Sequence, residues 1–337
     1  MSRVLSPSHG ALTQPRSPSG LIYAPVAHDL EAVERVFEDT IASPRPAIAR
    51  MLDRLTHYRG KRLRPTLLLL TARACGRMTP AHHVLGAVVE MVHTATLVHD
   101  DVLDEAGLRR HLPTVNAGWG NKAAILLGDY LFTHAFHLTS TIGEARACEL
   151  IGEATNRVCE GELHQTLQRG NLNLTEAEYF EIIDGKTAAL TACCCRLGAL
   201  YAGAGAETVE RLANFGRLLG LAFQVADDLL DLVGREDAAG KTLGTDLEQQ
   251  KLTLPLIHML AALPADEAAS LRSVLGNGKP KRAAVANALD RTGAVHYARE
   301  RAESLAADAA GELDALPPSE CRELLRMMTR WAVRRDT

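Results

Sequence analysis

Two apolar helical runs in this sequence end in the same acidic pattern, Asp-Asp-x-x-Asp, and this duplication constrains the fold more than any other feature. Residues four apart on a helix lie one above the other. The first and last carboxylates of each pattern therefore share a face, with the middle one beside them. The carboxylates are those of Asp100, Asp101, Asp104, Asp227, Asp228 and Asp231. The sequence predicts two long helices that each present an acidic face.

Like charges at this spacing destabilise a helix, so each acidic face requires a cation. A solvated helix end is the ordinary interpretation of one such cluster, but its repetition favours a metal site. No His or Cys stands at ligand spacing, and ligands that are all oxygens suit Mg²⁺. Mg²⁺ takes few carboxylates per ion and is completed by water and substrate phosphates. We therefore expect a Mg²⁺-bound phosphate or diphosphate between the two helices.

From Asp29 onward the apolar spacing is helical almost throughout, and an alternating strand pattern is missing. Helices are expected over residues 31–41, 46–57, 65–74, 121–141, 145–168 and 207–232. Thr79-Pro80 and Thr175-x-x-Glu178 are start signals of two more helices. Residues 1–26 are rich in Ser, Pro and Gly and predict a flexible N-terminal tail. The sequence predicts an all-α, single-domain protein over residues 27–337.

Composition excludes several classes of protein. The net charge of −4 does not suit a general nucleic-acid binder, which has a strongly basic face. Seven cysteines, three of them at Cys193–Cys195, form no paired metal motif and predict reduced, buried side chains. No apolar run reaches the length of a membrane span, and the N-terminus lacks an apolar signal core. We expect a cytoplasmic protein that does not span a membrane.

Basic residues gather beside both acidic patterns. They are Lys61, Arg62 and Arg64 in the segment 60–65, Arg109 and Arg110 after the first pattern, Lys186 before the second, and Lys241 and Lys251 after it. A single basic run is ordinarily a solvated surface cluster. Arg binds phosphate oxygens through paired hydrogen bonds and Lys binds them as a point charge. The whole set therefore indicates two diphosphates bound side by side.

The sequence resembles the trans-polyprenyl diphosphate synthases, and their long-chain members most closely, from about Tyr58 to about Leu260. Its motifs follow the family's order: Gly60-Lys-Arg-Leu-Arg-Pro65, Asp100-Asp-Val-Leu-Asp104 with Leu108-Arg-Arg110, Gly128-Asp-Tyr130, Lys186-Thr187, Gln224 with Asp227-Asp-Leu-Leu-Asp231, and Gly240-Lys-Thr-Leu-Gly-Thr-Asp246. One departure is His111, where the family usually has glycine. The resemblance implies an isoprenoid-synthase-type helical bundle around a central cavity, and a homodimer.

The resemblance also implies a role for each charged residue. Asp100 and Asp104 would hold Mg²⁺ on the allylic diphosphate, with Asp101 as a supporting member of that metal site. Asp227 would hold a further ion, supported by Asp228 and Asp231, with three Mg²⁺ ions in all. Lys61, Arg64, His93 and Arg110 would bind isopentenyl diphosphate. Arg109, Lys186 and Lys241 would bind the allylic diphosphate. Thr187 and Gln224 would face the developing carbocation, and Lys251 would help to neutralise released diphosphate.

The implied reaction is a Mg²⁺-dependent, head-to-tail condensation of isopentenyl diphosphate with an allylic diphosphate, by ionisation, attack and proton loss. Product length would be set along the first aspartate helix, where Val92, Ala95 and Thr96 are not aromatic. We expect an open tunnel and a C30–C50 product, with Phe132 or Phe136 as candidate floor residues. On its own, Ala95 is equally a helix-packing alanine.

Other functions are weighed against this one. A farnesyl or geranylgeranyl diphosphate synthase would catalyse the same reaction but release a shorter product. A terpene cyclase or squalene-type synthase is not expected to keep the segment 60–65 with both acidic patterns. A non-catalytic subunit of a heteromeric synthase is expected to have lost aspartates that this chain retains. His99, Trp119 and Trp331 are interpreted as packing residues, and Arg334 and Arg335 as solvated.

Overall fold

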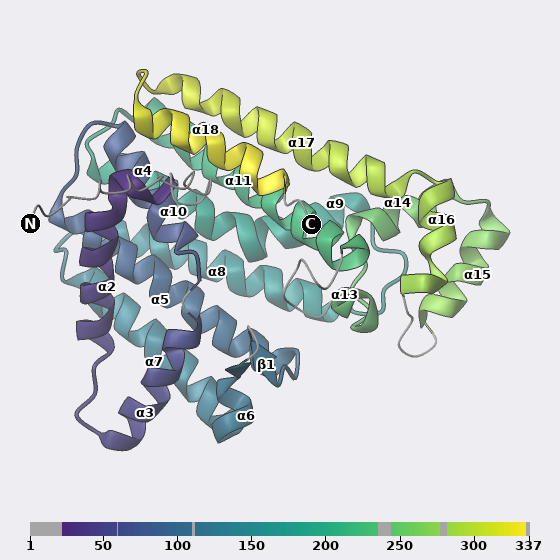
Figure 1. The fold of residues 1–337 in the computed structure, drawn as a ribbon, viewed down its shortest axis with the longest axis horizontal. Coiled ribbons are helices and arrows are strands. Elements are labelled where there is room, and N and C mark those ends of the chain that lie inside the picture. Colours follow the sequence, from purple (N-terminus) through teal and green to yellow (C-terminus); the bar gives the residue numbers. More distant parts are fainter. Residues whose placement is uncertain (1–21, 59, 110–111, 235–243, 277–281, 335–337) are drawn as a thin grey trace, which may run out of the picture.

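The computed structural model describes residues 22–58, 60–109, 112–234, 244–276 and 282–334 (Figure 1). Helices account for nearly all of these residues, which confirms the all-α prediction. Arg110, His111, Lys241, Arg335 and residues 1–21 of the predicted tail lie outside the described residues. The division of the chain at residue 26 therefore stays a prediction.

The first part of the chain contains η1 (Ala24–Val26), α2 (Ala27–Ile41), α3 (Pro46–Arg54), η2 (Leu55–Tyr58), α4 (Leu63–Ala74), α5 (Pro80–Leu103), β1 (Leu108–Arg109), β2 (Leu112–Pro113), α6 (Val115–Trp119), α7 (Asn121–Ser140) and α8 (Ala145–Leu167). The second part contains α9 (Glu176–Ile183), η3 (Asp184–Ala188), α10 (Ala189–Tyr201), α11 (Ala206–Val233), α13 (Thr245–Glu248), α14 (Leu254–Ala262), α15 (Ala265–Gly276), η4 (Arg282–Ala284), α16 (Ala286–Arg291), α17 (Ala294–Glu312), η5 (Leu313–Ala315) and α18 (Glu320–Val333). Of these, η3 is one π-helical turn and the other η elements are 3-10 helices.

Most predicted helices are confirmed, and the differences have local causes. The helix expected at 31–41 starts earlier, at Ala27, and the one expected at 46–57 becomes 3-10 after Arg54. Thr175 and Glu178 form the predicted capping box. The antiparallel pair of β1 and β2 was not expected, because two residues per strand are too few to show alternation.

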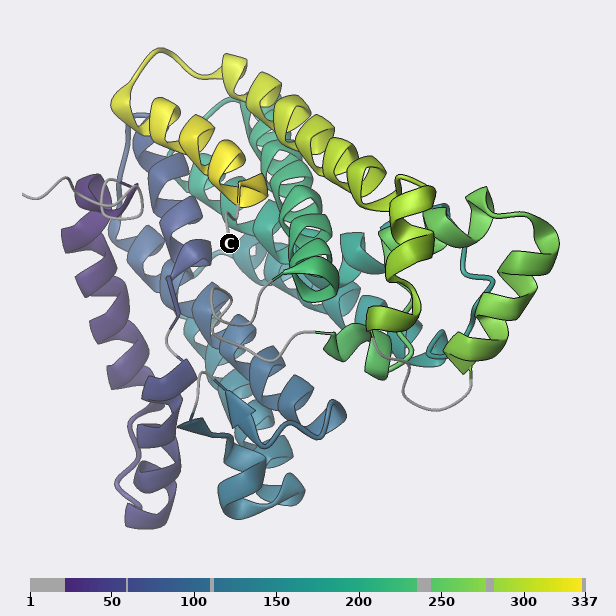
Figure 2. The ribbon, with the colours of Figure 1, turned by 45° about the vertical axis from the view of Figure 1, so that its right-hand side comes forward.

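The helices pack around a central pair, α4 and α10. Four consecutive leucines of α4, Leu67–Leu70, are completely buried, so this helix has no polar face. The helices α5 and α11 pack against this pair, α7 covers α5, and α17 and α18 lie along α11 (Figures 1 and 2). None of the described helices has both the length and the apolar character needed to cross a bilayer. The two aspartate helices are thus flanking helices of one bundle.

The cysteine prediction is right for α10 and wrong for α8. Cys193, Cys194 and Cys195 are buried free thiols, whereas Cys159 of α8 is exposed. Burial raises the pKa of Cys193 and of Cys195 to about 12, so these thiols are unreactive near neutral pH. The consecutive cysteines are therefore small core side chains.

Buried ion pairs attach α2 to the bundle. Asp29, which is 5% exposed, accepts hydrogen bonds from Arg73 at 2.6 and 3.0 Å and from His83 at 2.9 Å. Burial raises the pKa of Asp29, but the hydrogen bonds from His83 and Arg73 outweigh burial and hold it below its usual value. A carboxylate with a depressed pKa stabilises the fold above its unfolded-state pKa of about 3.9. This contribution is lost as the pH falls through the folded-state value.

Replacing Asp29 by asparagine is therefore expected to lower the free energy of unfolding by about 1–3 kcal/mol near neutral pH. Once the pH falls below the lowered pKa of Asp29, the parent has lost the same charge, so the difference between the two proteins shrinks. Urea unfolding of both proteins near neutral pH and in acid measures this. An equal difference at both would show that Asp29 stabilises the fold by something other than its charge.

Candidate active site

One lysine joins the carboxyl end of α5 to α13, the short helix that follows α11. Lys251 follows the second aspartate helix, and its Nζ lies 3.3 Å from Asp104 Oδ1 and 3.9 Å from Asp246 Oδ1. Asp104 also binds Arg169 Nη2 at 2.8 Å. The backbone N–H of Gly170 donates to the carbonyl of Gln250 at 3.0 Å, which brings both cations to the same carboxylate. Since the backbone N–H of Asp246 donates to Asp231 at 3.1 Å, Lys251 links the first acidic pattern to the second through Asp246.

The three carboxylates of the first pattern have different surroundings. Asp100 is half-buried, and burial raises its pKa to about 6 despite the opposing charge of Lys186. Asp101 is 1% exposed and accepts hydrogen bonds from the Tyr58 hydroxyl and from Arg109. Only Asp100 and Asp104 are partly exposed, so they are the ones that face a ligand.

The second pattern divides in the same way. Asp228 is buried and accepts hydrogen bonds from the Tyr179 hydroxyl and the Gln224 amide, both at 2.7 Å. Burial, together with the charge of Asp246, raises the pKa of Asp228. Asp231 is also buried, and its oxygens accept from the Thr245 hydroxyl and the Asp246 N–H at 3.1 Å. Asp227 alone of this pattern is partly exposed.

A π-helical turn presents Lys186 and Thr187. Such turns are rare and occur mostly at functional sites. The turn lies against α8 because residue 161 is glycine: a Cβ there would lie 2.3 Å from the backbone nitrogen of Lys186. Lys186 Nζ lies 2.5 Å from Glu162 Oε2 and 2.8 Å from Gln165 Oε1. The charges of Asp100 and Glu162 raise the pKa of Lys186 against the effect of burial, so the lysine is a cation beside the first pattern.

The basic segment 60–65 contains residues with different functions. Arg62 has a positive φ of 48° and pairs with Glu34 and Glu90, so it is a structural residue. Arg64 lines a narrow pocket, and its Nε is buried without a hydrogen-bond partner among the described residues. Lys61 Nζ lies 4.7 Å from the centre of the Trp331 ring. Among the described atoms of this segment, Arg64 Nε is therefore buried and lacks an acceptor.

The pocket beside Arg64 joins α4, η3, α11 and α18. Its lining includes Arg64, Thr187, Phe223, Met328 and Trp331. The Thr187 hydroxyl donates to Gln224 Oε1 at 2.7 Å, which ties this pocket to the second acidic pattern. Trp331, interpreted from the sequence as a packing residue, forms part of the wall of this pocket.

The proposed chain-length residues lie in the core. Val92 and Ala95 are fully buried, and the Thr96 hydroxyl donates to the carbonyl of His93, which is itself half-buried, at 2.8 Å. Phe132 is half-buried against the ring of His99, but Phe136 is 37% exposed on α7. An exposed ring does not suit the floor of an enclosed tunnel within one chain, so Phe132 is the better candidate.

Two other residues interpreted from sequence are placed as expected. His99 Nε2 lies 3.0 Å from the carbonyl oxygen of Ile125. Its ring occupies the space where a Cβ at residue 128 would stand, which explains the glycine of the Gly128-Asp-Tyr130 motif. Arg334 is exposed at the end of α18. His99 is thus a packing residue and not a ligand.

Several residues of the site were missed by the sequence analysis: Tyr58, Glu162, Gln165, Arg169 and Tyr179. Each reaches the aspartates or Lys186 from another element, so no local pattern marks it. The Nε of Arg169, like that of Arg64, is buried without a hydrogen-bond partner among the described residues.

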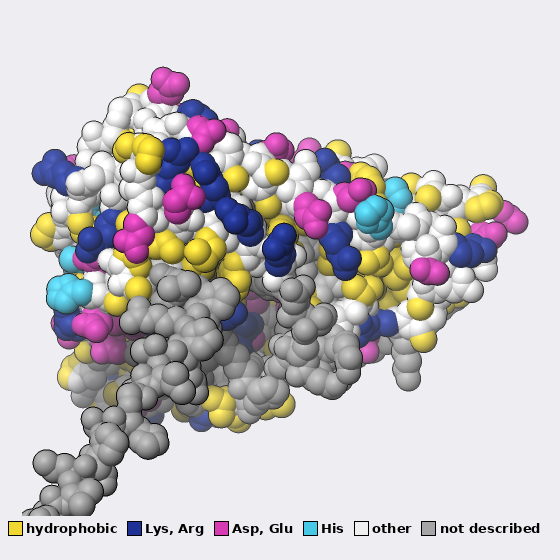
Figure 3. Space-filling model, turned by 45° about the horizontal axis from the view of Figure 1, so that its top comes forward, with side chains coloured by type: hydrophobic (Ala, Val, Ile, Leu, Met, Phe, Trp, Pro, Cys, Tyr) yellow, Lys and Arg dark blue, Asp and Glu magenta, His cyan; other side chains and the backbone are white. Residues whose placement is uncertain are grey.

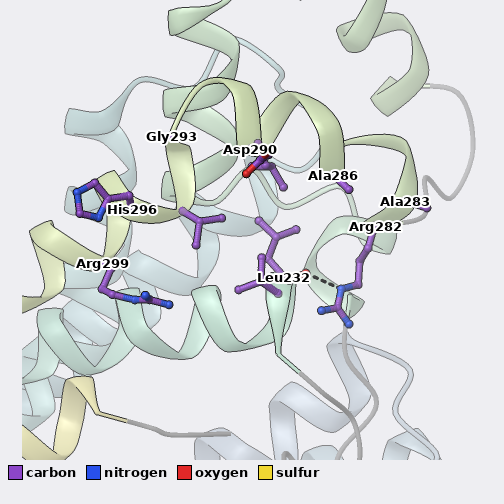
Figure 4. Close-up of a pocket in the computed structure, with 11 residues that line it drawn as sticks. Leu232, Arg282, Ala283, Ala286, Asp290, Gly293, His296 and Arg299 are labelled. Carbon is purple, nitrogen blue, oxygen red and sulfur yellow. Dashed lines mark hydrogen bonds between the residues drawn. The ribbon is translucent and has the colours of Figure 1, made fainter.

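A wide pocket lies away from these residues, beside the end of α11 (Figure 4). Arg282 at its edge donates to the carbonyl oxygens of Leu232 and Gly234 at 2.5 and 2.7 Å. These groups belong to the last turn of α11 and the residue after it, so Arg282 caps the second aspartate helix. The nearby surface of α17 and α18 shows basic and acidic side chains interspersed (Figure 3). We interpret this pocket as a consequence of the cap.

The donor set fits a hard cation. Within the described residues, no group of three or more His, Cys, Asp or Glu side chains could hold a metal ion by itself. Mg²⁺ usually takes one or two carboxylates and completes its shell with water and substrate phosphates. The partly exposed carboxylates Asp100, Asp104 and Asp227 match that requirement.

Known proteins resemble this chain over most of its length. A family model for polyprenyl synthetase matches residues 45–292. The octaprenyl diphosphate synthase of Escherichia coli is 38% identical over 279 residues, which are 82% of this chain and 86% of that protein. A decaprenyl diphosphate synthase structure from Rhodobacter capsulatus is 36% identical with a TM-score of 0.89, covering 94% of this chain and 99% of its own. A polyprenyl synthase structure from Caulobacter crescentus, complexed with calcium and isoprenyl diphosphate, is 34% identical with a TM-score of 0.87, covering 95% and 99%.

The helical bundle described above is therefore an isoprenoid-synthase fold. The chain belongs to the polyprenyl synthetase family, and it is a prenyltransferase. Both statements confirm what the sequence resemblance implied.

Proposed function

We propose that this prenyltransferase is a long-chain trans-polyprenyl diphosphate synthase. It adds isopentenyl diphosphate units head to tail to an allylic diphosphate and depends on Mg²⁺. The observation that carries the proposal is the link between the two acidic patterns: Lys251 lies between Asp104 and Asp246, and the Asp246 N–H donates to Asp231. The charge of Asp100 also raises the pKa of Lys186. Two carboxylate clusters ringed by cations are what two diphosphates with Mg²⁺ require.

Mg²⁺ would be held by Asp100, Asp104 and Asp227, and would act as a Lewis acid on the leaving diphosphate. The resemblance implies the same division between carboxylates that bind the metal and carboxylates that support them. Asp101, Asp228 and Asp231 accept hydrogen bonds from protein donors and are assigned to hold neighbouring residues in place. We also propose that the site binds three Mg²⁺ ions, the number that the resemblance implies.

The chain's own cations would bind the two diphosphates. Arg109 and Lys186, with Lys241 by resemblance, are assigned to the allylic diphosphate. Lys61, Arg64 and His93, with Arg110 by resemblance, are assigned to isopentenyl diphosphate. The pocket beside Arg64 offers this substrate a buried donor and an apolar wall that includes Phe223 and Met328. The oxygens of Thr187 and Gln224 lie at the edge of that pocket, where positive charge would develop.

The long product is supported by the helix that carries the first pattern. Val92 and Ala95 are small or aliphatic side chains before Asp100, and no aromatic ring stands at these positions. The compared proteins from Escherichia coli and Rhodobacter capsulatus are named for octaprenyl and decaprenyl products. A C30–C50 product is the length that fits these observations.

A homodimer would cover an apolar surface on α7 and α8. Ile125 and Leu126 of α7 are 44% and 68% exposed, and Leu163 and Leu167 of α8 are 62% and 81% exposed. Exposed apolar surface spread over neighbouring helices is typical of an interface between subunits. A second copy of this chain is the proposed partner.

Removal of divalent cations tests the proposed reaction. Excess EDTA is expected to stop the incorporation of labelled isopentenyl diphosphate into extractable product, because Mg²⁺ at Asp100, Asp104 and Asp227 is required for ionisation. Added Mg²⁺ restores the incorporation. Activity that persists in EDTA would exclude a metal-dependent mechanism at these carboxylates. A Mg²⁺-loaded protein without any incorporation would favour a non-catalytic subunit.

A further inference from the structure

The two aspartate helices share a feature beyond the pattern itself. The middle carboxylate of each, Asp101 and Asp228, accepts a hydrogen bond from a buried tyrosine on a different element. Tyr58 OH lies 2.5 Å from Asp101 Oδ2, and Tyr179 OH lies 2.7 Å from Asp228 Oδ2. Both tyrosines are 3% exposed. The arrangement is thus duplicated with the motif, although η2 and α9 supply the two hydroxyls.

At the first pattern, Tyr58 and a diphosphate-binding arginine hold the same carboxylate. Arg109 donates to Asp101 Oδ1 from Nε at 2.9 Å and from Nη2 at 2.8 Å. The guanidinium also lies 5.6 Å from the centre of the Tyr58 ring, and the tyrosine oxygen accepts the Val115 N–H at 3.3 Å. Tyr58 therefore limits the orientations of Asp101, and Asp101 fixes Arg109.

At the second pattern, the tyrosine begins a chain of hydrogen bonds. Asp228 accepts from Tyr179 at one oxygen and from Gln224 Nε2 at the other. Since the Gln224 amide nitrogen faces Asp228, its carbonyl oxygen faces Thr187, whose hydroxyl donates to it. Because the Thr187 hydroxyl donates its hydrogen to Gln224, its oxygen lone pairs point away from Gln224. The chain thus orients the oxygens of both Gln224 and Thr187.

We propose that Tyr58 and Tyr179 are positioning residues for the reaction assigned above, Tyr58 acting through Asp101 on Arg109 and Tyr179 acting through Asp228 on Gln224 and Thr187. The inference rests on the proposed function. The alternative is that each tyrosine only satisfies a buried hydroxyl, as tyrosines in cores ordinarily do. A positioning role predicts a change in KM or kcat when the hydroxyl is removed, whereas a packing role predicts lower stability with both constants unchanged.

The test compares Tyr58→Phe and Tyr179→Phe with Tyr130→Phe, which removes a hydroxyl bonded at 3.1 Å to the Ile41 carbonyl on α2. Loss of a hydrogen bond to a charged group corresponds to about a tenfold change in an equilibrium or rate constant. Tyr58→Phe is expected to raise the KM of the allylic diphosphate about tenfold at similar kcat. Tyr179→Phe is expected to lower kcat about tenfold at similar KM. Tyr130→Phe should change neither.

Two further measurements separate positioning from stability. Calorimetry with inorganic diphosphate and Mg²⁺ should show weaker binding by Tyr58→Phe and unchanged binding by Tyr130→Phe. In an Arg109→Gln background, Tyr58→Phe should have no additional effect, because it acts through Arg109. Equal losses of melting temperature in the three variants, without change in KM, kcat or diphosphate binding, would overturn the inference. If the wild-type protein forms no product, the proposed function fails, and the calorimetric comparison still decides the role of Tyr58.

Discussion

Replacing Asp100 or Asp227 by alanine is expected to remove most of the condensation activity while the protein keeps its fold. Both carboxylates are partly exposed, whereas the middle aspartates are buried and bonded to tyrosines. Burial disfavours the charged form of Asp100 and raises its pKa to about 6. Truncating the side chain removes this unfavourably buried carboxylate, so we expect the fold to persist.

The expected loss is on the order of 10²–10³-fold or more in kcat, the size found when one electrostatic partner of a transition state is removed. Asp308→Ala is the matched control, because Asp308 is exposed on α17 and belongs to neither acidic pattern. Circular dichroism and melting temperature establish that each variant is folded. A folded Asp100→Ala or Asp227→Ala protein that turns over like its parent would exclude these carboxylates as metal ligands.

Replacing Ala95 by phenylalanine is expected to shorten the product to C15 or C20 without stopping condensation. Ala95 lies five residues before Asp100, about 7.5 Å along the helix axis at 1.5 Å per residue. A ring at that depth would meet the growing tail after few isoprene units. Overpacking a buried site costs about 1–3 kcal/mol, so melting temperature is recorded together with product length.

Ala95→Ser is the control for this prediction, since it changes the same buried position by one atom. Its product should keep the parent's length. Chromatography of the dephosphorylated prenyl alcohols measures both. An unchanged long product from a folded Ala95→Phe protein would show that the tail takes another path, and that Ala95 is a packing residue.

Periodicity predicted the helices because most of them bury one continuous face, as the agreement at α7, α8 and α11 shows. The aspartates were recognisable because their spacing is local to one helix. Helix ends were less accurate where another element decides them. The change from α-helix to 3-10 after Arg54 places Tyr58 under Asp101, a contact between residues 43 positions apart.

The parts of the site that could not be predicted depend on tertiary contacts. Arg62 and Arg64 stand in one basic segment, but Arg62 forms ion pairs with Glu34 and Glu90. Arg64 has a buried Nε without a hydrogen-bond partner among the described residues. Nothing in the local sequence shows that Arg62 and Arg64 have different roles. Arg169 likewise reaches Asp104 only because the segment after α8 is bonded to Gln250.

Product analysis tests the central claim most directly. Purified protein is given Mg²⁺, isopentenyl diphosphate and farnesyl diphosphate, and the extracted prenyl chains are sized. The account predicts one discrete product between C30 and C50, which requires both the condensation and an open path beside Ala95. A stop at C20 would keep the reaction and refute the long tunnel. No elongation at all would contradict the proposed synthase.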